Sequence, residues 1–424
     1  MNDREIPLSP DSSRPGWWHN IAFRQIRAAA AGFELFEDEL AESEWNSARL
    51  FEIRKRRRDA LAQRLGCWTA DLANRPIMDK RVLRNDPESL LTGLIDPRDE
   101  IVVRTSGTTG IPTVIRHSDD YLVERAAQRL RLYRSYRVPA YPRVLQVSAK
   151  PGRPVLAYGP PAGAGAGTIL SFNVAGLDDE NRSHVDRTVA EFAPHLLAGQ
   201  SMELLAYADE VSAGRMAPTS ADTALSQGDT LLNSTRRSIQ EILGLVLFDT
   251  YGLQEFGQIA FECPDIQGNY HINAEAVDLR TDQTSVIHIT SLINRAMSLV
   301  NYRTDDEGLL GSSHCACGRA LPVLQQLQGR QRPLIRGRDG RGRQATNLQT
   351  TVSDLLGEVW QLQQPAPGRV IIRAPRDLEH RDLTGLRKAE AAYDVEIMVE
   401  QHDVADLLDK SGKFVRYLRG TQGD

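Results

Sequence analysis

The stretch IVVRTSGTTGIPT, residues 101–113, gives the strongest indication of the fold. Its first three residues, Ile101 to Val103, are apolar and β-branched and predict a short buried strand. Hydroxyl residues and glycines follow this strand, namely Thr105, Ser106, Gly107, Thr108, Thr109 and Gly110. Such a backbone can wrap closely round a ligand, and its hydroxyls and N–H groups suit polyphosphate oxygens. It is not a Walker P-loop, because no Gly-Lys-Ser/Thr follows, and a plain flexible loop is the alternative interpretation.

A second segment, FDTYGLQEFG at residues 248–257, follows the apolar strand Leu245–Phe248. A tyrosine at a strand end, next to a glycine, can present its ring flat against a base. Four residues after Tyr251, Glu255 offers a hard carboxylate oxygen for Mg²⁺. Taken alone, this pattern is more often a surface turn.

Together with three further motifs, these segments resemble the adenylate-forming superfamily and, within it, the phenylacetate-CoA ligase group. TSGTTGIPT resembles the family's phosphate loop, and YGLQE at 251–255 resembles its YGLSE motif. YRTDD at 302–306 resembles YRTGD, and Gly329-Arg330 resembles the GRxDD entry to a hinge between two domains. SGKFVR at 411–416 resembles the C-terminal SGKxxR signature. The resemblance covers roughly residues 75–420.

The resemblance implies a role in nucleotide binding for each matching position. Residues 105–110 would hold the phosphates of ATP, the Tyr251 ring would stack on adenine with Gly252 in the same motif, and Asp249 would contact the adenine edge. Glu255 would bind magnesium, and Asp306 would accept both ribose hydroxyls, as a carboxylate can. Arg330 would reach the ribose or a phosphate. Without the family pattern, the segment around Asp306 reads as a solvated acidic turn.

Lys413 is the implied catalytic residue. An ammonium placed between the carboxylate oxygen of the substrate and the α-phosphate would offset the charge that develops during in-line attack. The chain contains six lysines, which makes a lysine after Ser-Gly more informative than usual. A solvated lysine of the tail is the alternative. The sequence also departs from the family pattern at four positions, Ile111, Gln254, Asp305 and Arg332, where the family has lysine, a small hydroxyl residue, glycine and aspartate.

Four residues outside these motifs form a candidate zinc site. Cys315 and Cys317 are too close in sequence for a relaxed disulfide but can share one metal ion, and Cys263 and His271 lie upstream. Three thiolates and one imidazole complete a tetrahedral set for a structural Zn²⁺. Incidental buried thiols are the alternative, and His314 is an alternative ligand. Relatives in the phenylacetate-CoA ligase group carry a similar arrangement, which favours the metal.

The succession of patterns predicts an α/β fold with two domains. We expect a large mixed α/β N-terminal domain at 1–331 and a small mobile α+β C-terminal domain at 332–424, separated by the Arg/Gly-rich stretch 329–344. Residues 17–75 are expected to be helical, further helices are expected at 119–137, 182–197 and 234–243, and strands at 101–103, 144–147, 168–172, 245–248, 370–373 and 395–399.

Composition narrows the class of protein. The chain has 424 residues, a net charge of −5 and a sequence pI near 6.0, so no nucleic-acid partner is expected. No stretch of about 18 apolar residues occurs, so no membrane partner is expected either. The polar residues 1–16 do not resemble a secretory signal, and four cysteines are too few for a disulfide scaffold. A cytoplasmic enzyme is the default expectation, and we consider a homodimer as its oligomeric state.

The function implied by the resemblance is ATP-dependent activation of a carboxylic acid, with CoA as the acceptor of the acyl group. The expected cofactors are ATP, Mg²⁺, CoA and a structural Zn²⁺, and an aromatic acid is the expected substrate. An adenylating enzyme that delivers the acyl group to an amine or a carrier protein is the main alternative. A non-catalytic nucleotide-binding homologue is the third possibility.

Overall fold

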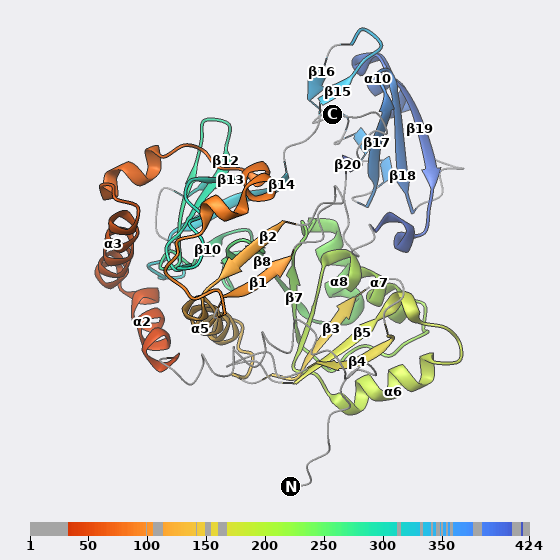
Figure 1. Cartoon of the computed structure of the whole chain (residues 1–424). Coiled ribbons are helices and arrows are strands. Elements are labelled where there is room, and N and C mark those ends of the chain that lie inside the picture. Colours follow the sequence, from red (N-terminus) through yellow and green to blue (C-terminus); the bar gives the residue numbers. More distant parts are fainter. Residues whose placement is uncertain are drawn as a thin grey trace.

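The computed structural model describes residues 33–424, apart from fifteen gaps within that span or at its end. These gaps are 99, 105–112, 141, 149–153, 160–167, 312–314, 331–333, 341, 345–347, 349–350, 353–354, 357–358, 376–383 and 409–416, together with 419–424. The predicted α/β class is confirmed, since a large sheet is covered by helices and a smaller sheet follows it in the chain (Figure 1).

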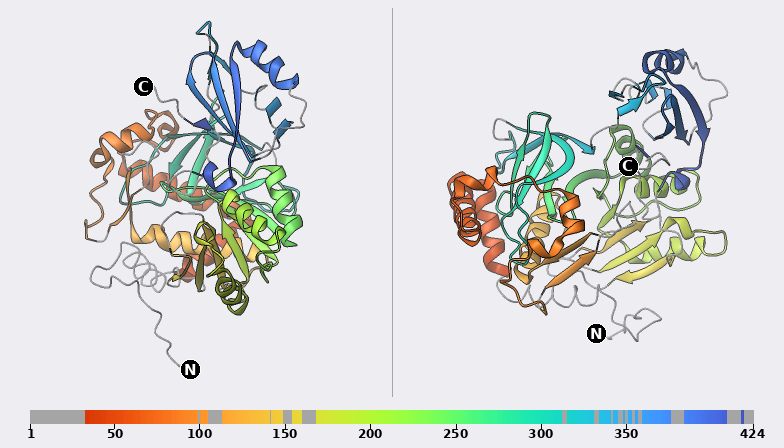
Figure 2. Two further views of the ribbon diagram at one scale, coloured as in Figure 1. Left: turned by 90° about the vertical axis from the view of Figure 1, so that its right-hand side faces the viewer. Right: turned by 45° about the horizontal axis from the view of Figure 1, so that its top comes forward.

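The N-terminal helices form a separate layer beside the large sheet (Figures 1 and 2). They are α2 (Phe33–Trp45), α3 (Ser47–Arg64), η1 (Thr69–Asn74), α4 (Lys80–Asn85) and η2 (Pro87–Leu90). The described part of the segment 17–75 is mostly helical, as expected, but it is divided into separate helices, because Asn46 leaves the helical conformation and its side chain accepts a hydrogen bond from the Arg49 N–H at 3.1 Å. Asparagine is a favoured N-cap, so it starts a new helix there.

Twelve strands form the large sheet, in the order β11-β12-β13-β14-β10-β9-β8-β7-β6-β3-β5-β4. Strands β3 (Val144–Ser148), β5 (Ile169–Asn173), β6 (Leu196–Gly199), β7 (Thr223–Gln227) and β8 (Val246–Leu253) are parallel, with β4 (Leu156–Gly159) antiparallel at the edge. The antiparallel half contains β9 (Gly257–Glu262), β10 (Tyr270–Ile272), β11 (Val277–Thr281), β12 (Val286–Ser291), β13 (Tyr302–Leu310) and β14 (Val323–Arg330). Strand β8 joins the halves, since it pairs parallel with β7 and antiparallel with β9.

Helices α6 (Arg182–Phe192), α7 (Ser201–Ser212) and α8 (Asn233–Leu243) cover the parallel half, whereas α5 (Asp119–Ser135) packs against β9 and α2. The prediction of a single helix over 182–197 is wrong beyond Phe192, because Ala193 adopts φ +46° and Pro194 follows it. A left-handed residue followed by proline ends a helix, and the next residues, Leu196–Gly199, form the buried strand β6.

Buried ion pairs tie the helical layer to the sheet. Arg131 on α5 donates to Glu275 Oε1 at 2.7 Å, and both side chains are completely buried. Arg57 on α3 donates to Glu124 on α5 at 2.6 and 2.9 Å. Charges buried at such depth persist only when they are paired, so these contacts fix how the helices dock.

A short hairpin carries the glycine-rich segment. Strands β1 (Ile101–Arg104) and β2 (Val114–His117) are antiparallel, and Arg104 lies opposite Val114 at the end of the ladder. The strand expected at 101–103 is therefore present, and helix α5 follows at the expected place. Residues 105–110 themselves lie outside the described residues.

The strands on the two sides of residue 331 belong to different sheets. After β14 come the hairpin β15 (Leu334–Arg336) and β16 (Gly342–Gln344), and then a four-stranded sheet in the order β19-β18-β17-β20. Its strands are β17 (Gln361–Ala366), β18 (Arg369–Ala374), β19 (Glu396–Gln401) and β20 (Tyr417–Leu418). Helix α10 (Thr384–Tyr393) lies between β18 and β19 in the chain, and η4 (Val404–Leu407) lies between β19 and β20. This sheet has a core of its own around Trp360, while Val359 and Leu408 pack against the core of the parallel half. Of the described helices, none has the length and apolarity needed to cross a bilayer.

Candidate nucleotide site and metal centre

Tight backbone packing forms the hairpin between β8 and β9, which carries Tyr251 and Glu255. A Cβ atom on Gly252 would lie 2.7 Å from the Gly257 carbonyl oxygen, so only glycine fits there. Gly257 has φ +72°, and a Cβ on it would lie 2.6 Å from the Tyr121 hydroxyl. The two glycines therefore bring β9 and helix α5 close to the end of β8. The close approach of the Gly257 carbonyl oxygen is therefore enough to explain why residue 252 is a glycine.

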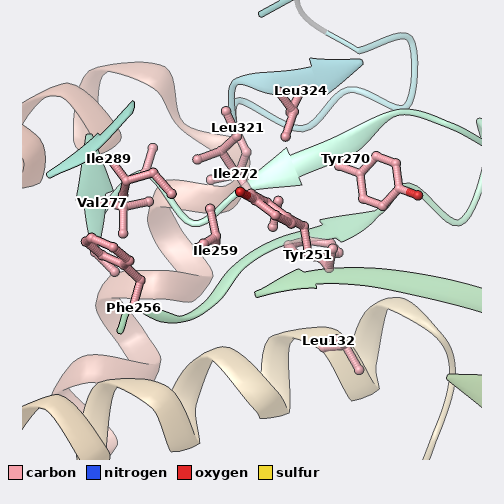
Figure 3. Packing of buried hydrophobic residues seen from close by; sticks show 14 of the residues in the cluster. Leu132, Tyr251, Phe256, Ile259, Tyr270, Ile272, Val277, Ile289, Leu321 and Leu324 are labelled. Atoms are coloured by element: carbon pink, nitrogen blue, oxygen red, sulfur yellow. The ribbon is translucent and has the colours of Figure 1, made fainter. Parts of the chain in front are cut away.

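Tyr251 and Asp306 meet in the interior, although 55 residues separate them in the chain. The Tyr251 hydroxyl donates to Asp306 Oδ2 at 2.9 Å, and the two residues are 7% and 9% exposed. The Tyr251 ring lies within the apolar cluster that includes Phe256, Ile259 and Tyr270 (Figure 3). Burial, with the nearby Asp306 carboxylate, raises the pKa of Tyr251 well above its ordinary value, so the hydroxyl remains a donor.

The residue before Asp306 adopts an unusual backbone conformation. Asp305 has φ +66°, in the left-handed region that glycine adopts without strain. Asparagine and aspartate are the other residues that tolerate this region, which is why aspartate can stand at a position where the resemblance has glycine. The turn directs the Asp306 side chain inward, and the Asp306 N–H donates to Thr304 Oγ1 at 3.1 Å.

Glu255 is buried beside the first residue of strand β13. The Tyr302 hydroxyl donates to Glu255 Oε1 at 3.3 Å, and Glu255 is 5% exposed. Strand β13 thus carries one acidic candidate, Asp306, which bonds to Tyr251, and contacts the other, Glu255, through Tyr302.

His117 connects the end of β2 to the turn that carries Glu255. Its Nε2 lies 3.3 Å from the Gln254 carbonyl oxygen, and its Nδ1 lies 3.4 Å from the Asn294 amide nitrogen. A carbonyl can only accept and an amide nitrogen can only donate, so the ring carries its proton on Nε2 and is neutral. Burial, together with the charge of Arg125, lowers the pKa of His117 to about 3, in agreement with this tautomer. The hairpin that carries the glycine-rich segment therefore reaches the Gln254–Glu255 turn.

Asp249 lies two residues before Tyr251, on the same face of β8. Its Oδ2 accepts a hydrogen bond from the Tyr270 hydroxyl at 2.8 Å, while its Oδ1 is buried without a partner among the described residues. Burial raises the pKa of Asp249 to about 7, and the neighbouring Glu262 contributes to the rise. A buried carboxyl with an unused oxygen could still bind a polar ligand group.

The remaining nucleotide-site candidates are only partly located. The backbone of Arg330 on β14 pairs with that of Asp306 on β13, but the Arg330 side chain is outside the described part of the molecule. Residues 105–110 and Lys413 also lie outside it, as do Ile111 and Arg332. The structure thus brings together Asp249, Tyr251, Gly252, Glu255, Asp306 and the backbone of Arg330.

The four expected metal ligands come together at the end of β9 and β10. The donor atoms of Cys263, His271, Cys315 and Cys317 all lie within 4.8 Å of one another. Cys315 Sγ is 3.8 Å from Cys263 Sγ, and Cys317 Sγ is 3.3 Å from His271 Nε2. Three sulfur atoms and one ring nitrogen at this spacing fit a four-coordinate zinc ion. The alternative ligand, His314, lies outside the described residues.

The N-terminal helices contact the segment that carries Cys315 and Cys317. Arg319, two residues after Cys317, donates to Glu44 Oε1 at 2.7 Å and lies 4.8 Å over the Trp45 ring. The cluster therefore lies where α2 meets the sheet.

Three residues of this site escaped the sequence analysis, namely His117, Tyr270 and Tyr302. Tyr302 lies inside the YRTDD motif, so the motif pointed to it, but a motif does not tell which carboxylate a tyrosine will meet. His117 and Tyr270 gave no signal beyond their position in short apolar strands. Only the packing of distant strands reveals their partners.

Comparisons with known proteins agree with the predicted resemblance, although no family model matches the chain. Phenylacetate-coenzyme A ligase of Pseudomonas putida is 27% identical over 254 residues, which cover 56% of this chain and 56% of that protein. The chain thus spans about half the length of the curated relative that it matches.

Solved structures of 2-hydroxyisobutyryl-CoA ligase share the fold over nearly the whole chain. The postadenylation-state structure with R3-HIB-AMP has a TM-score of 0.61 at 14% identity, covering 99% of this chain and 95% of that chain. An open conformation of that ligase with 2-HIB-AMP and CoA has a TM-score of 0.55 at 12% identity and covers 92% and 90%. The chain is therefore similar in sequence to phenylacetate-coenzyme A ligase and has the fold of the acyl-CoA ligases.

Proposed function

We propose that the protein activates a carboxylic acid with ATP and then transfers the acyl group to the thiol of CoA. A carboxylate oxygen attacks the α-phosphorus, the bond to pyrophosphate breaks, and an acyl-adenylate forms. The thiolate sulfur then attacks the acyl carbon, and AMP leaves as the thioester forms. The observation that carries the proposal is the Tyr251–Asp306 hydrogen bond, which joins the two motifs implied to bind adenosine.

The proposed roles follow the positions that the motifs share with the family. Tyr251 and Asp249 would contact the base, with Gly252 shaping the strand end, while Asp306 and Arg330 would hold the ribose. Residues 105–110 would cradle the phosphates at the Arg104–Val114 end of the β1–β2 hairpin, whose other end contacts the Gln254–Glu255 turn through His117. Glu255 would bind Mg²⁺, which would neutralise phosphate charge. A buried carboxylate held by a tyrosine hydroxyl is suited to a hard cation.

We further propose that residues 332–424 act as a mobile domain that brings Lys413 to the α-phosphate. The support is that this part of the chain has its own sheet and its own core, and that β14 ends at the proposed boundary. A separate core allows the small domain to move without unfolding. Lys413→Ala should then reduce adenylation by orders of magnitude while leaving the thermal unfolding curve unchanged.

The substrate class and the acceptor belong to the same proposal. The relationship to phenylacetate-coenzyme A ligase favours an aromatic acid and CoA. Exchange of labelled pyrophosphate into ATP, measured against a library of carboxylic acids, tests the first step. Product analysis with CoA, amines and carrier proteins tests the second step. Exchange with no acid in the library would refute adenylation, and acyl-AMP that accumulates without consumption of CoA would refute the thioester step.

For the metal cluster we propose a structural zinc ion held by Cys263, His271, Cys315 and Cys317. The support is the donor set, which fills a tetrahedral shell and leaves no position for a substrate. Elemental analysis of protein purified without chelator should find one zinc ion per chain. A metal-free preparation that folds and unfolds like the untreated protein would exclude a structural role.

A further inference from the structure

A cavity of about 480 Å³ lies between the N-terminal helices and the segment that precedes β13, away from the residues discussed above. Its walls come from the end of α3, the turns on either side of α4, the stretch after η2 and the residues just before β13. The wall segments between residues 64 and 94 are orange in Figures 1 and 2. None of Tyr251, Glu255 and Asp306 lines the cavity.

Exposed apolar side chains line the mouth of the cavity. Ile77, Val82 and Leu94 are 59%, 37% and 53% exposed. Single exposed apolar side chains are ordinary, but three that line one hollow offer an apolar ligand a place to pack. Leu65, Leu90 and Leu91 continue this lining toward the interior. A ligand with an apolar body would be desolvated by these walls.

Two arginines lie in the same cavity, and none of the described residues that line it carries a carboxylate. Neither Arg64 nor Arg75 forms an ion pair with any residue that the structure describes, and the buried Arg64 Nε has no hydrogen-bond partner there. Other half-buried arginines of α3, Arg54 and Arg58, are paired with a carboxylate, that of Asp278. Burial and the neighbouring Arg295 guanidinium lower the pKa of Arg64. Like charges gathered in a hollow favour an anion.

We propose that this cavity binds a small organic anion with an apolar body, whose carboxylate or phosphate head is held by Arg64 and Arg75. A guanidinium offers parallel N–H donors that match either head group, and the volume suits an aryl or short alkyl body. This site is separate from the proposed adenylation site, and binding to it does not depend on that activity.

The site has a physical connection to the strand that carries the adenylation residues. The Met78 N–H donates to the Asn301 carbonyl oxygen at 3.2 Å, and the Arg303 N–H donates to the Met78 carbonyl oxygen at 2.7 Å. Met78 lines the cavity, while Asn301 and Arg303 flank Tyr302. One wall of the cavity is therefore hydrogen-bonded to the start of β13.

Isothermal titration calorimetry of the full chain tests the proposal with three probes. These are 4-bromophenylacetate, 4-bromophenyl phosphate and the neutral 4-bromophenylacetamide, and the first two distinguish a carboxylate from a phosphate head. At least one anion should bind and the amide should not. Arg64→Gln should weaken that binding about tenfold or more, as expected when a charge-assisted hydrogen bond is lost. Crystals soaked with the bound probe should show bromine in the cavity.

Two further variants separate binding from folding. Arg49→Gln removes the same charge from the same helix, at a residue that pairs with Glu42 and Glu52 outside the cavity, and should leave binding unchanged. Val82→Trp should block the mouth without removing a charge. Unchanged binding in both Arg64→Gln and Val82→Trp, or bromine bound elsewhere only, would overturn the proposal. The absence of binding by both anions at millimolar concentration would do the same.

Discussion

Replacing Tyr251 with phenylalanine tests the contact on which the nucleotide site depends. The substitution keeps the ring and removes only the hydroxyl that donates to Asp306 at 2.9 Å. Because Asp306 is 9% exposed, water cannot readily replace the lost donor. A hydrogen bond to a charged group contributes about 1.5–3 kcal/mol, so we expect Tyr251→Phe to lower the free energy of unfolding by that amount.

Denaturant unfolding of four proteins measures this effect. The wild type, Tyr251→Phe, Asp306→Asn and the double variant form a cycle whose coupling energy isolates the Tyr251–Asp306 contact. Tyr136→Phe is a matched control, since the buried Tyr136 hydroxyl donates to a neutral acceptor, the Glu262 carbonyl oxygen, at 2.8 Å. It should cost only about 0.5–1.5 kcal/mol. A coupling energy near zero, with equal losses for the two tyrosine variants, would refute the reasoning.

The same variant separates the stacking and ribose roles that we propose. The phenylalanine ring can still stack on a base, whereas Asp306 loses the donor that orients it. We therefore expect the KM for ATP to rise about tenfold, equivalent to about 1.4 kcal/mol, while the KM for the acid stays constant. An unchanged KM for ATP would show that Asp306 is oriented without Tyr251.

Three more predictions follow from single contacts. Burial raises the pKa of the Asp249 carboxyl to about 7 in the folded state, whereas in the unfolded state the pKa has its ordinary value of about 4. Between these two pH values only the folded state holds the proton. The free energy of unfolding should therefore fall as the pH rises from about 4 to above 7. Asp249→Asn should remove this pH dependence, which amounts to at most about 4 kcal/mol. If the unfolding free energies of the variant and the wild type change equally with pH, the raised pKa does not belong to Asp249. Asp305→Gly should stabilise the protein by about 1 kcal/mol, because φ +66° costs glycine nothing, and a lower denaturation midpoint would argue against strain. Cys317→Ser should reduce bound zinc and destabilise the protein, whereas Cys67→Ser, at a thiol outside the cluster, should do neither; equal zinc contents in the two variants would exclude Cys317 as a ligand.

Helices α5 and α6 show where the local sequence is sufficient to predict a helix and where it is not. Helix α5 was predicted to within two residues, because a long run of helix-forming residues with buried positions at helical spacing has few alternatives. The predicted helix over 182–197 absorbed strand β6, since four apolar residues fit either a helix or a strand. Pro194 is the local signal of that boundary, because a proline cannot continue a helix.

The sequence by itself determined the α/β class and the adenylate-forming motifs, because each depends on residue types at short spacing. It also supplied the Cys₃His donor set, through the residue types and the resemblance, since His271 and Cys315 lie far apart in the chain. Only the tertiary structure decided that Tyr302 would hold Glu255, that the Tyr251 hydroxyl would bond Asp306 rather than solvent, and that Arg64 would face a cavity without a carboxylate. These outcomes depend on the order of strands in the large sheet, in which β13 and β8 lie three strands apart with β14, β10 and β9 between them. Strand order results from the packing of the whole core, and no local stretch of residues encodes it.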